Sequence, residues 1–188
     1  MFEPSNVSLP LEPAVTSFQV RLLAPEDLPA LADTFEHAPY RKPRSQYERY
    51  LAEHLAGTLV TLVAHAHTGE VVGYVNLLWS SDYPRFADAD VPEINDLNVV
   101  VPWRRRGVGT ALITAAETVA RDAGRPRVGI GVGMTPDYDD ARRLYPTLGY
   151  VYDGFGPRPT DYGEAEYLTK QLSPGAGQHD AWRTPRGW

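Results

Sequence analysis

Residues 99–110 read Val-Val-Val-Pro-Trp-Arg-Arg-Arg-Gly-Val-Gly-Thr. The β-branched run at its start predicts the end of a strand, and Pro102 with the two glycines predicts a tight turn. Apolar residues then recur at helical spacing from Val108 to Val119, and Gly124 ends the run. The stretch therefore predicts a strand, a turn and an amphipathic helix, with glycines where the helix begins.

A helix that begins in this way predicts an anion-binding site. Its first N–H groups have no partner within the helix and lie at the positive end of the helix dipole. Arg104, Arg105 and Arg106 add positive charge beside them. The spacing matches neither a P-loop nor a dinucleotide-binding fingerprint. The pattern indicates a bound phosphate group without naming the molecule that carries it.

A second segment narrows the choice. Residues 141–150 read Ala-Arg-Arg-Leu-Tyr-Pro-Thr-Leu-Gly-Tyr. Together the two segments resemble the GNAT superfamily of N-acyltransferases. Its pyrophosphate loop reads Gln or Arg, two residues, Gly, one residue, then Gly or Ala, and Arg104, Gly107 and Gly109 match it. Its later helix reads Ala-x-x-Leu-Tyr-x-x-x-Gly-aromatic. Many relatives carry an asparagine three residues before that alanine, where this chain has Tyr138.

The rest of the chain extends the pattern on both sides. Strands are predicted over residues 17–23, 58–66, 71–79, 94–101, 127–132, 150–152 and 165–170, and helices over 25–36, 46–56, 108 to the stop at 124, and 139–148. The fold class is α+β. The resemblance, over about residues 18–172, implies a mixed, mostly antiparallel twisted sheet of about seven strands with about four helices. It also implies that the strands over 94–101 and 127–132 splay apart to admit the cofactor.

Composition bounds the organisation of the chain. Its 188 residues suit one domain over residues 17–172, between an irregular arm over 1–16 and a tail over 173–188. No apolar run approaches the roughly 20 residues of a membrane helix, and no signal-peptide layout is present, so we expect a cytoplasmic protein that does not bind membranes. The net charge of −6 argues against nonspecific nucleic-acid binding. The oligomeric state, a homodimer included, stays open.

The sequence contains no cysteine, which excludes disulfides, thiolate metal sites and a cysteine nucleophile. Direct transfer in a ternary complex is then the simpler route, and we expect no metal. His65 and His67 alternate on one strand, but no acidic or thiol partners flank them, so we interpret them as structural.

The resemblance implies transfer of an acetyl group from acetyl-CoA to a primary amine of a small molecule or peptide. Tyr145 would protonate the leaving thiolate, and a backbone N–H near Val99 would stabilise the oxyanion. Glu93 is the first candidate for the general base and Asp96 the second. In a regular strand these two side chains face opposite ways, so both reach the site only if the strand has a bulge.

The residues expected to contact the cofactor lie on the strand, the loop and the later helix. They are Leu97, Val99, Val101, Arg104, Arg105, Arg106, Gly107, Val108, Gly109, Thr110 and Tyr145.

Competing interpretations remain. Glu93 and Asp96 could be solvated acids, and Tyr145 a core aromatic residue. The glycines at 129, 131 and 133 leave one face of a strand without side chains. This pattern indicates either close approach of pantetheine or acceptor, or tight packing of a helix. A transferase for a longer acyl-CoA and a non-catalytic acyl-CoA-binding regulatory domain are the alternative functions.

Overall fold

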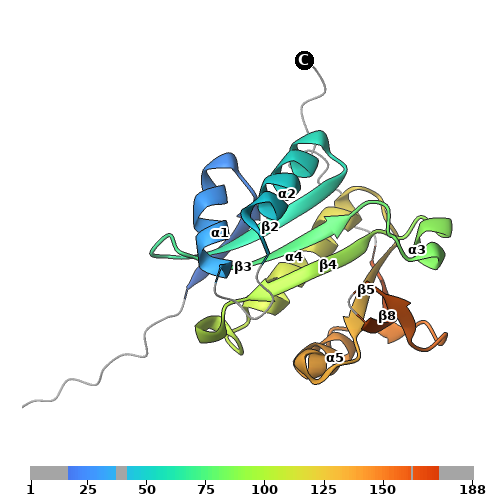
Figure 1. Cartoon of the computed structure of the whole chain (residues 1–188). Coiled ribbons are helices and arrows are strands. Elements are labelled where there is room, and N and C mark those ends of the chain that lie inside the picture. Colours follow the sequence, from blue (N-terminus) through green and yellow to red (C-terminus); the bar gives the residue numbers. More distant parts are fainter. Residues whose placement is uncertain (1–16, 37–41, 162, 174–188) are drawn as a thin grey trace, which may run out of the picture.

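The computed structural model describes residues 17–36, 42–161 and 163–173 (Figure 1). The arm predicted over 1–16 and residues 174–188 of the predicted tail lie outside the described residues. The described chain forms one eight-stranded sheet in the order β1-β2-β3-β4-β5-β8-β6, with β7 paired to β8. All neighbours are antiparallel except β4 and β5. The α+β prediction, with its mixed and mostly antiparallel sheet, is confirmed.

The strands are β1 (Phe18–Leu22), β2 (Leu59–Ala66), β3 (Val71–Leu78), β4 (Glu93–Val99), β5 (Arg127–Gly133), β6 (Val151–Tyr152), β7 (Arg158–Thr160) and β8 (Gly163–Gln171). The α-helices are α1 (Leu28–Phe35), α2 (Arg44–Ala56), α3 (Pro84–Asp88), α4 (Val108–Asp122) and α5 (Asp139–Thr147). Short 3₁₀ turns cover Pro25–Asp27, Val101–Trp103 and Pro136–Tyr138.

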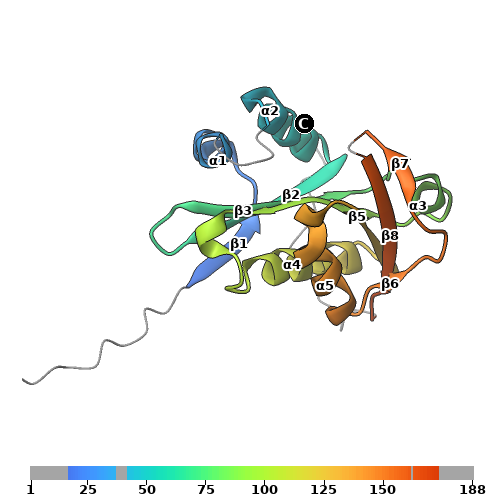
Figure 2. The same cartoon turned by 60° about the horizontal axis from the view of Figure 1, so that its bottom comes forward.

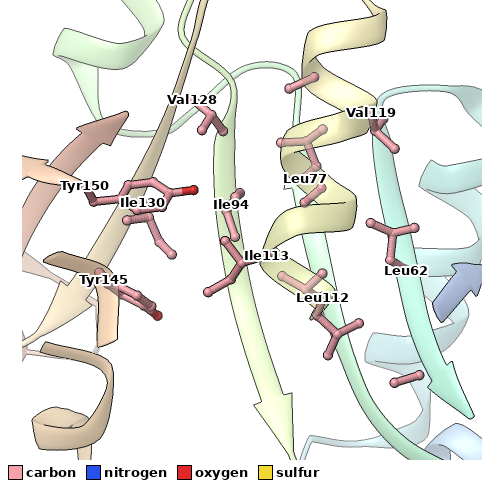
Figure 3. Packing of buried hydrophobic residues seen from close by; sticks show 14 of the residues in the cluster. Leu62, Leu77, Ile94, Leu112, Ile113, Val119, Val128, Ile130, Tyr145 and Tyr150 are labelled. Carbon is pink, nitrogen blue, oxygen red and sulfur yellow. The ribbon is translucent and has the colours of Figure 1, made fainter. Parts of the chain in front are cut away.

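Helices cover both faces of the sheet. Figure 2 shows α1 and α2 on one face and α4 and α5 on the other. β3 is buried along almost its whole length, because it lies in the middle of the sheet between two cores. On the α4 face, Leu112 and Ile113 pack against Ile94 and Ile130 (Figure 3). On the other face, Tyr74 packs among side chains of α1 and α2.

The two parallel strands separate soon after they meet. β4 and β5 pair only at Glu93 with Gly129 and at Ile94 with Ile130. Beyond Ile94, β4 continues along β3, whereas β5 stays paired with β8 over its full length. The expected splay is therefore confirmed: beyond Ile94 the backbones of β4 and β5 no longer pair, and we call the gap between the two strand backbones the opening (Figure 1).

Two short elements were not predicted. α3 has only five residues, too few to show a helical period, and β7 has three residues with a proline at its centre. Each is held by tertiary contacts, α3 through Phe86 and β7 by pairing with β8. As the sequence predicts, α5 is short, and it ends one residue after Pro146.

A buried polar cluster ties α4 to the C-terminal strands. Glu117 on α4 is 4% exposed, and it accepts hydrogen bonds from the Tyr150 hydroxyl at 2.9 Å and from Lys170 Nζ at 2.7 and 2.9 Å. The Lys170 ammonium also lies 5.5 Å from the centre of the Tyr150 ring. The cluster holds the turn that follows α5 against α4, and α5 is the helix that carries Tyr145.

Lys170→Met should destabilise the protein by about 3 kcal/mol, because it leaves the Glu117 carboxylate buried without its cation. Urea denaturation gives the free energy of unfolding. Tyr150→Phe, which removes one hydrogen bond but keeps the ion pair, should cost only about 1 kcal/mol. Equal losses in the two variants would contradict the importance of the ion pair.

Candidate active site

The loop before α4 presents unpaired backbone donors. Gly107 has φ +86° and caps the helix without a side-chain hydrogen bond, and Arg105 also has a positive φ of 60°. The N–H of Ala111 makes a helical bond to the Gly107 carbonyl at 2.9 Å, so the N–H groups of Val108, Gly109 and Thr110 come before the helical ladder. The first turn has no acidic residue. This geometry suits an anion.

The three arginines surround this helix start and are exposed. Arg104 Nε donates to the Val99 carbonyl at 3.1 Å, which ties the loop to the end of β4. The Arg106 guanidinium lies 5.8 Å from the Trp103 ring centre. Arg105 lies 3.9 Å from Asp140 on α5, a solvent-exposed pair that contributes little to stability. All three arginines therefore lie in the loop that leads into α4, with their side chains exposed to solvent.

Gly109 has open space around it. A Cβ built there would meet Leu97 Cδ2 and Val99 Cγ2 at 3.9 Å, an ordinary contact. The structure thus brings together Leu97, Val99 and the helix start, as the cofactor prediction requires. Val101, also predicted to contact the cofactor, lies in the adjoining 3₁₀ turn and is 65% exposed.

Gly109→Leu should lower CoA affinity more than tenfold without unfolding the protein, since the added side chain occupies the space beside the helix N–H groups. Calorimetric titration with CoA measures this loss. Gly109→Ala is the matched control, and its affinity should stay within about threefold of wild type. Equal CoA affinity in the leucine variant would remove this loop from the cofactor site.

β4 carries a bulge. Asn76 pairs with Asn95, but Tyr74 pairs with Asn98, so two residues of β4 lie opposite one residue of β3. Asp96, within the bulge, has a left-handed φ of 54°. The extra residue turns Asp96 onto the same face of the sheet as Glu93, which satisfies the condition set by the sequence.

The Asp96 carboxylate is surrounded by donors. The hydroxyls of Tyr50 and Tyr74 each donate to Oδ2 at 2.8 Å, Asn98 Nδ2 donates to Oδ1 at 2.9 Å, and Lys42 forms an ion pair with it. Burial, and then the Asp96 charge, raises the pKa of both tyrosines, which keeps their hydroxyls protonated as donors. The carboxylate has little capacity left to take a proton from a substrate.

Glu93 is less fully paired. It is 6% exposed, and it accepts a hydrogen bond from the Ser81 hydroxyl and one from Asn95 Nδ2 at 3.3 Å. Burial raises the pKa of this carboxyl, and Asp82 raises it further, while the bonds from Ser81 and Asn95 partly oppose the shift. A buried carboxylate with a raised pKa is suited to accept a proton.

Aromatic rings cover the bare face of β5. A Cβ at Gly129 would overlap the ring of Phe86 on α3, and one at Gly133 would overlap Tyr138. At Gly131 a Cβ would lie 3.2 Å from Tyr167 and 3.5 Å from Glu93 Oε1. Close packing within the protein therefore explains these glycines. The groups that approach them are aromatic rings, whereas the sequence suggested the packing of a helix.

Tyr145 lies on the other face. It is 5% exposed and packs in the α4 core, with its ring 6.1 Å from that of Tyr150. Figure 3 shows it where the strands that carry Ile94 and Ile130 diverge. No residue in the described ranges hydrogen-bonds its hydroxyl. Burial raises the pKa of this phenol, and Tyr138 adds to the effect, so the hydroxyl keeps its proton.

Sequence reasoning missed the partners of the two carboxylates. Tyr50, Tyr74 and Lys42 reach Asp96 from α2, β3 and the segment before α2, and Ser81 reaches Glu93 from the loop after β3. These contacts join residues 12 to 54 positions apart in the chain. No local spacing marks them, and only the tertiary fold brings them together.

No group of three or more potential metal-ligating side chains occurs among the described residues. None of the helices in the part of the chain that the structure describes is both long and apolar enough to cross a membrane.

Comparison with solved structures supports the fold. An acetyltransferase of the GNAT family from Staphylococcus aureus Mu50 is 13% identical, with a TM-score of 0.64 over 84% of this chain and 100% of its own. The Salmonella typhimurium protein yncA, solved with its cofactor acetyl-CoA, is 20% identical, with a TM-score of 0.66 over 89% and 100%. The PaiA N-acetyltransferase of Thermoplasma acidophilum, solved with coenzyme A, is 15% identical, with a TM-score of 0.61 over 82% and 99%.

None of the curated protein sequences matches this chain. Residues 25–150, more than half of the sequence, match the acetyltransferase (GNAT) family. The chain therefore belongs to the GNAT family of acetyltransferases and is an acyltransferase that uses an acyl-CoA.

Proposed function

We propose that this protein transfers the acetyl group of acetyl-CoA directly to a primary amine, in a ternary complex. One observation carries the proposal: the opening between β4 and β5 has Glu93 on one face of the sheet and Tyr145 on the other. An amine and a thioester could thus approach from opposite faces and meet in the opening. The free N–H groups at the start of α4 follow β4 in the chain, after the loop over residues 100–107.

The phosphates of acetyl-CoA would bind the N–H groups of Val108, Gly109 and Thr110, with charge from the adjacent arginines. The pantetheine arm would then run past Leu97 and Val99 into the opening.

A backbone donor is available there for the thioester carbonyl. The Val100 N–H donates to Val72 on β3 at 3.0 Å, and neighbouring residues in a strand direct their backbone groups to opposite sides. The Val99 carbonyl accordingly points away from β3, toward Arg104, and the Val99 N–H points into the opening. This amide is our candidate for stabilising the oxyanion.

In the proposed reaction, Glu93 takes a proton from the acceptor amine, directly or through one water. The neutral amine attacks the thioester carbonyl, the C–N bond forms, and the charge on oxygen is stabilised near Val99. The C–S bond then breaks while Tyr145 donates a hydrogen bond to the departing CoA thiolate. The nitrogen loses its second proton to solvent, and the thiolate takes a proton from Tyr145, which solvent replaces. Asp96, whose lone pairs are occupied, is the weaker candidate for the base.

The rings over β5 bear on the proposed acyl group. A longer acyl chain would need open space above the strand glycines, but Phe86, Tyr138 and Tyr167 fill that face. The packing therefore favours acetyl-CoA.

The first experiment is calorimetry with acetyl-CoA, combined with an assay of CoA release against amines, aminoglycosides and peptides. We expect binding, and turnover with one acceptor class. Initial velocities should give intersecting lines when both substrates are varied, because no covalent acyl-enzyme forms. Absence of acetyl-CoA binding would refute the proposal. Binding without turnover on any acceptor class would instead favour the non-catalytic acyl-CoA-binding alternative.

A further inference from the structure

The bulge in β4 decides which way the cofactor half of the site faces. Ile94, Leu97 and Val99 all pack in the α4 core. In a regular strand, residues three apart face opposite sides, so the extra residue at the bulge is what turns Leu97 and Val99 toward α4. Without it, both side chains would face α2 and the Val99 amide would point at β3. Glu93, which precedes the bulge, would keep its place.

The bulge is held by the side chain of its own strained residue. Asp96 adopts a left-handed φ of 54°, a conformation that residues other than glycine adopt at an energetic cost. Its carboxylate, 12% exposed, binds donors from three other segments: Tyr50 on α2, Tyr74 on β3 and Lys42 before α2. Asn98, which follows the bulge in β4, donates the remaining hydrogen bond to this carboxylate.

We infer that Asp96 is a positioning residue: its largely buried carboxylate fixes the β4 bulge and thereby directs the Val99 amide and the Leu97 side chain into the acyl-CoA opening. This inference rests on the proposed function for its kinetic consequence, but its structural part stands on the bulge alone. Asp96 acts through the backbone of β4, and the base remains Glu93.

Asp96→Asn tests the charge while preserving the backbone preference, since asparagine also tolerates the left-handed region. We expect kcat to fall about 10²-fold, as for a displacement of about 1 Å in a reacting group. The KM for acetyl-CoA should change less than kcat, and the acid limb of the pH profile should stay where it is in the wild type. Tyr50→Phe and Tyr74→Phe, each lacking one donor, should lower kcat in the same way.

Asp27→Asn is the matched control. Asp27 is also a buried carboxylate, 4% exposed, and accepts two bonds from Arg21 at 2.6 Å and one from the Ala24 N–H at 2.9 Å. It lies near β1, away from the opening, so its loss should lower stability and leave kcat unchanged. If Asp96→Asn does not fold, the two tyrosine variants decide the question.

Two results would overturn the inference. If Asp96→Asn abolishes the acid limb, Asp96 is the base. If it and both tyrosine variants keep kcat within about twofold of wild type, the carboxylate does not control the bulge.

A readout independent of turnover separates this inference from the proposed function. In amide NMR spectra of the ligand-free protein, Asp96→Asn should shift the Leu97 and Val99 resonances, whereas Asp27→Asn should not. If the resonances shift as expected but the wild type transfers no acetyl group, the proposed function is refuted and the positioning of the bulge by Asp96 is supported. Unchanged resonances would refute the positioning itself.

Discussion

Glu93→Gln should lower kcat/KM for the acceptor about 10³-fold, within the range lost when a general base is removed. A lysine-like amine has a pKa of about 10.4, so only a small neutral fraction exists near pH 7, and the reaction depends on removal of its proton. CoA affinity should stay unchanged, because the proposed phosphate site lies at the start of α4 and not at Glu93. Steady-state kinetics and calorimetry on the same preparation measure both quantities.

The pH profile identifies the group that titrates. Burial raises the pKa of Glu93 above its ordinary value of 4.5, and in the proposed mechanism the carboxylate is the active form. Activity should therefore fall as the pH drops through this raised pKa, and the acid limb should vanish in Glu93→Gln. Ser81→Ala removes a hydrogen bond that lowers this pKa, so it should move the limb to higher pH. Asp82→Asn removes a charge that raises it and should move the limb to lower pH.

The same shift predicts the effect on stability. A carboxyl group whose pKa is raised in the folded state contributes stability below its unfolded pKa, and this contribution is lost as the pH rises through the folded pKa. Glu93→Gln removes the buried charge, so its Tm at neutral pH should equal or exceed that of the wild type. A loss of activity with a raised Tm cannot come from unfolding. An acid limb that persists in the variant would show that another group is the base.

The proposed cofactor site could be inferred from sequence, because the residues that form it are close together in the chain. The strand, the turn glycines and the start of the α4 helix lie within residues 99–110, and the backbone geometry of Gly107 follows from its residue type. The splay of the two strands could be expected only from the family resemblance. It depends on β5 pairing with β8 across more than thirty residues of intervening chain.

The acceptor side was less accessible to such reasoning. The alternation rule gave the condition under which Glu93 and Asp96 share a face, but the bulge that meets it is fixed by tyrosines from α2 and β3. In the same way, three strand glycines marked a close approach, and only the fold shows that aromatic rings make it. Periodicity locates strands and faces, whereas departures from it depend on contacts distant in sequence.

The two carboxylates differ in what their surroundings permit. Asp96 binds four donors and can hold a strained backbone, while Glu93 binds two and keeps capacity to accept a proton. Both lie on β4, three residues apart. In the proposed site, the bulge between them lets one strand supply a proton acceptor on one face and an amide directed into the opening.

Tyr145→Phe should lower kcat about 10²-fold, as when one donor to a developing charge is removed, while the dissociation constant for acetyl-CoA stays within about threefold. A free thiol has a pKa of about 8.5 and a phenol about 10, so complete proton transfer to the thiolate is uphill, and burial of Tyr145 makes it more so. The hydroxyl therefore acts mainly by its hydrogen bond as the C–S bond breaks.

This account makes the Tyr145 effect independent of pH. Because burial raises the pKa of the phenol, it stays protonated below about pH 10, and the variant should lose the same factor at every pH assayed. Tyr150→Phe is the control: it keeps the neighbouring ring, 6.1 Å away, and removes only the hydroxyl that donates to Glu117, so stability should fall and kcat should not. Equal turnover in Tyr145→Phe would leave Tyr145 as a core residue, and the thiolate would then take its proton from water in the opening.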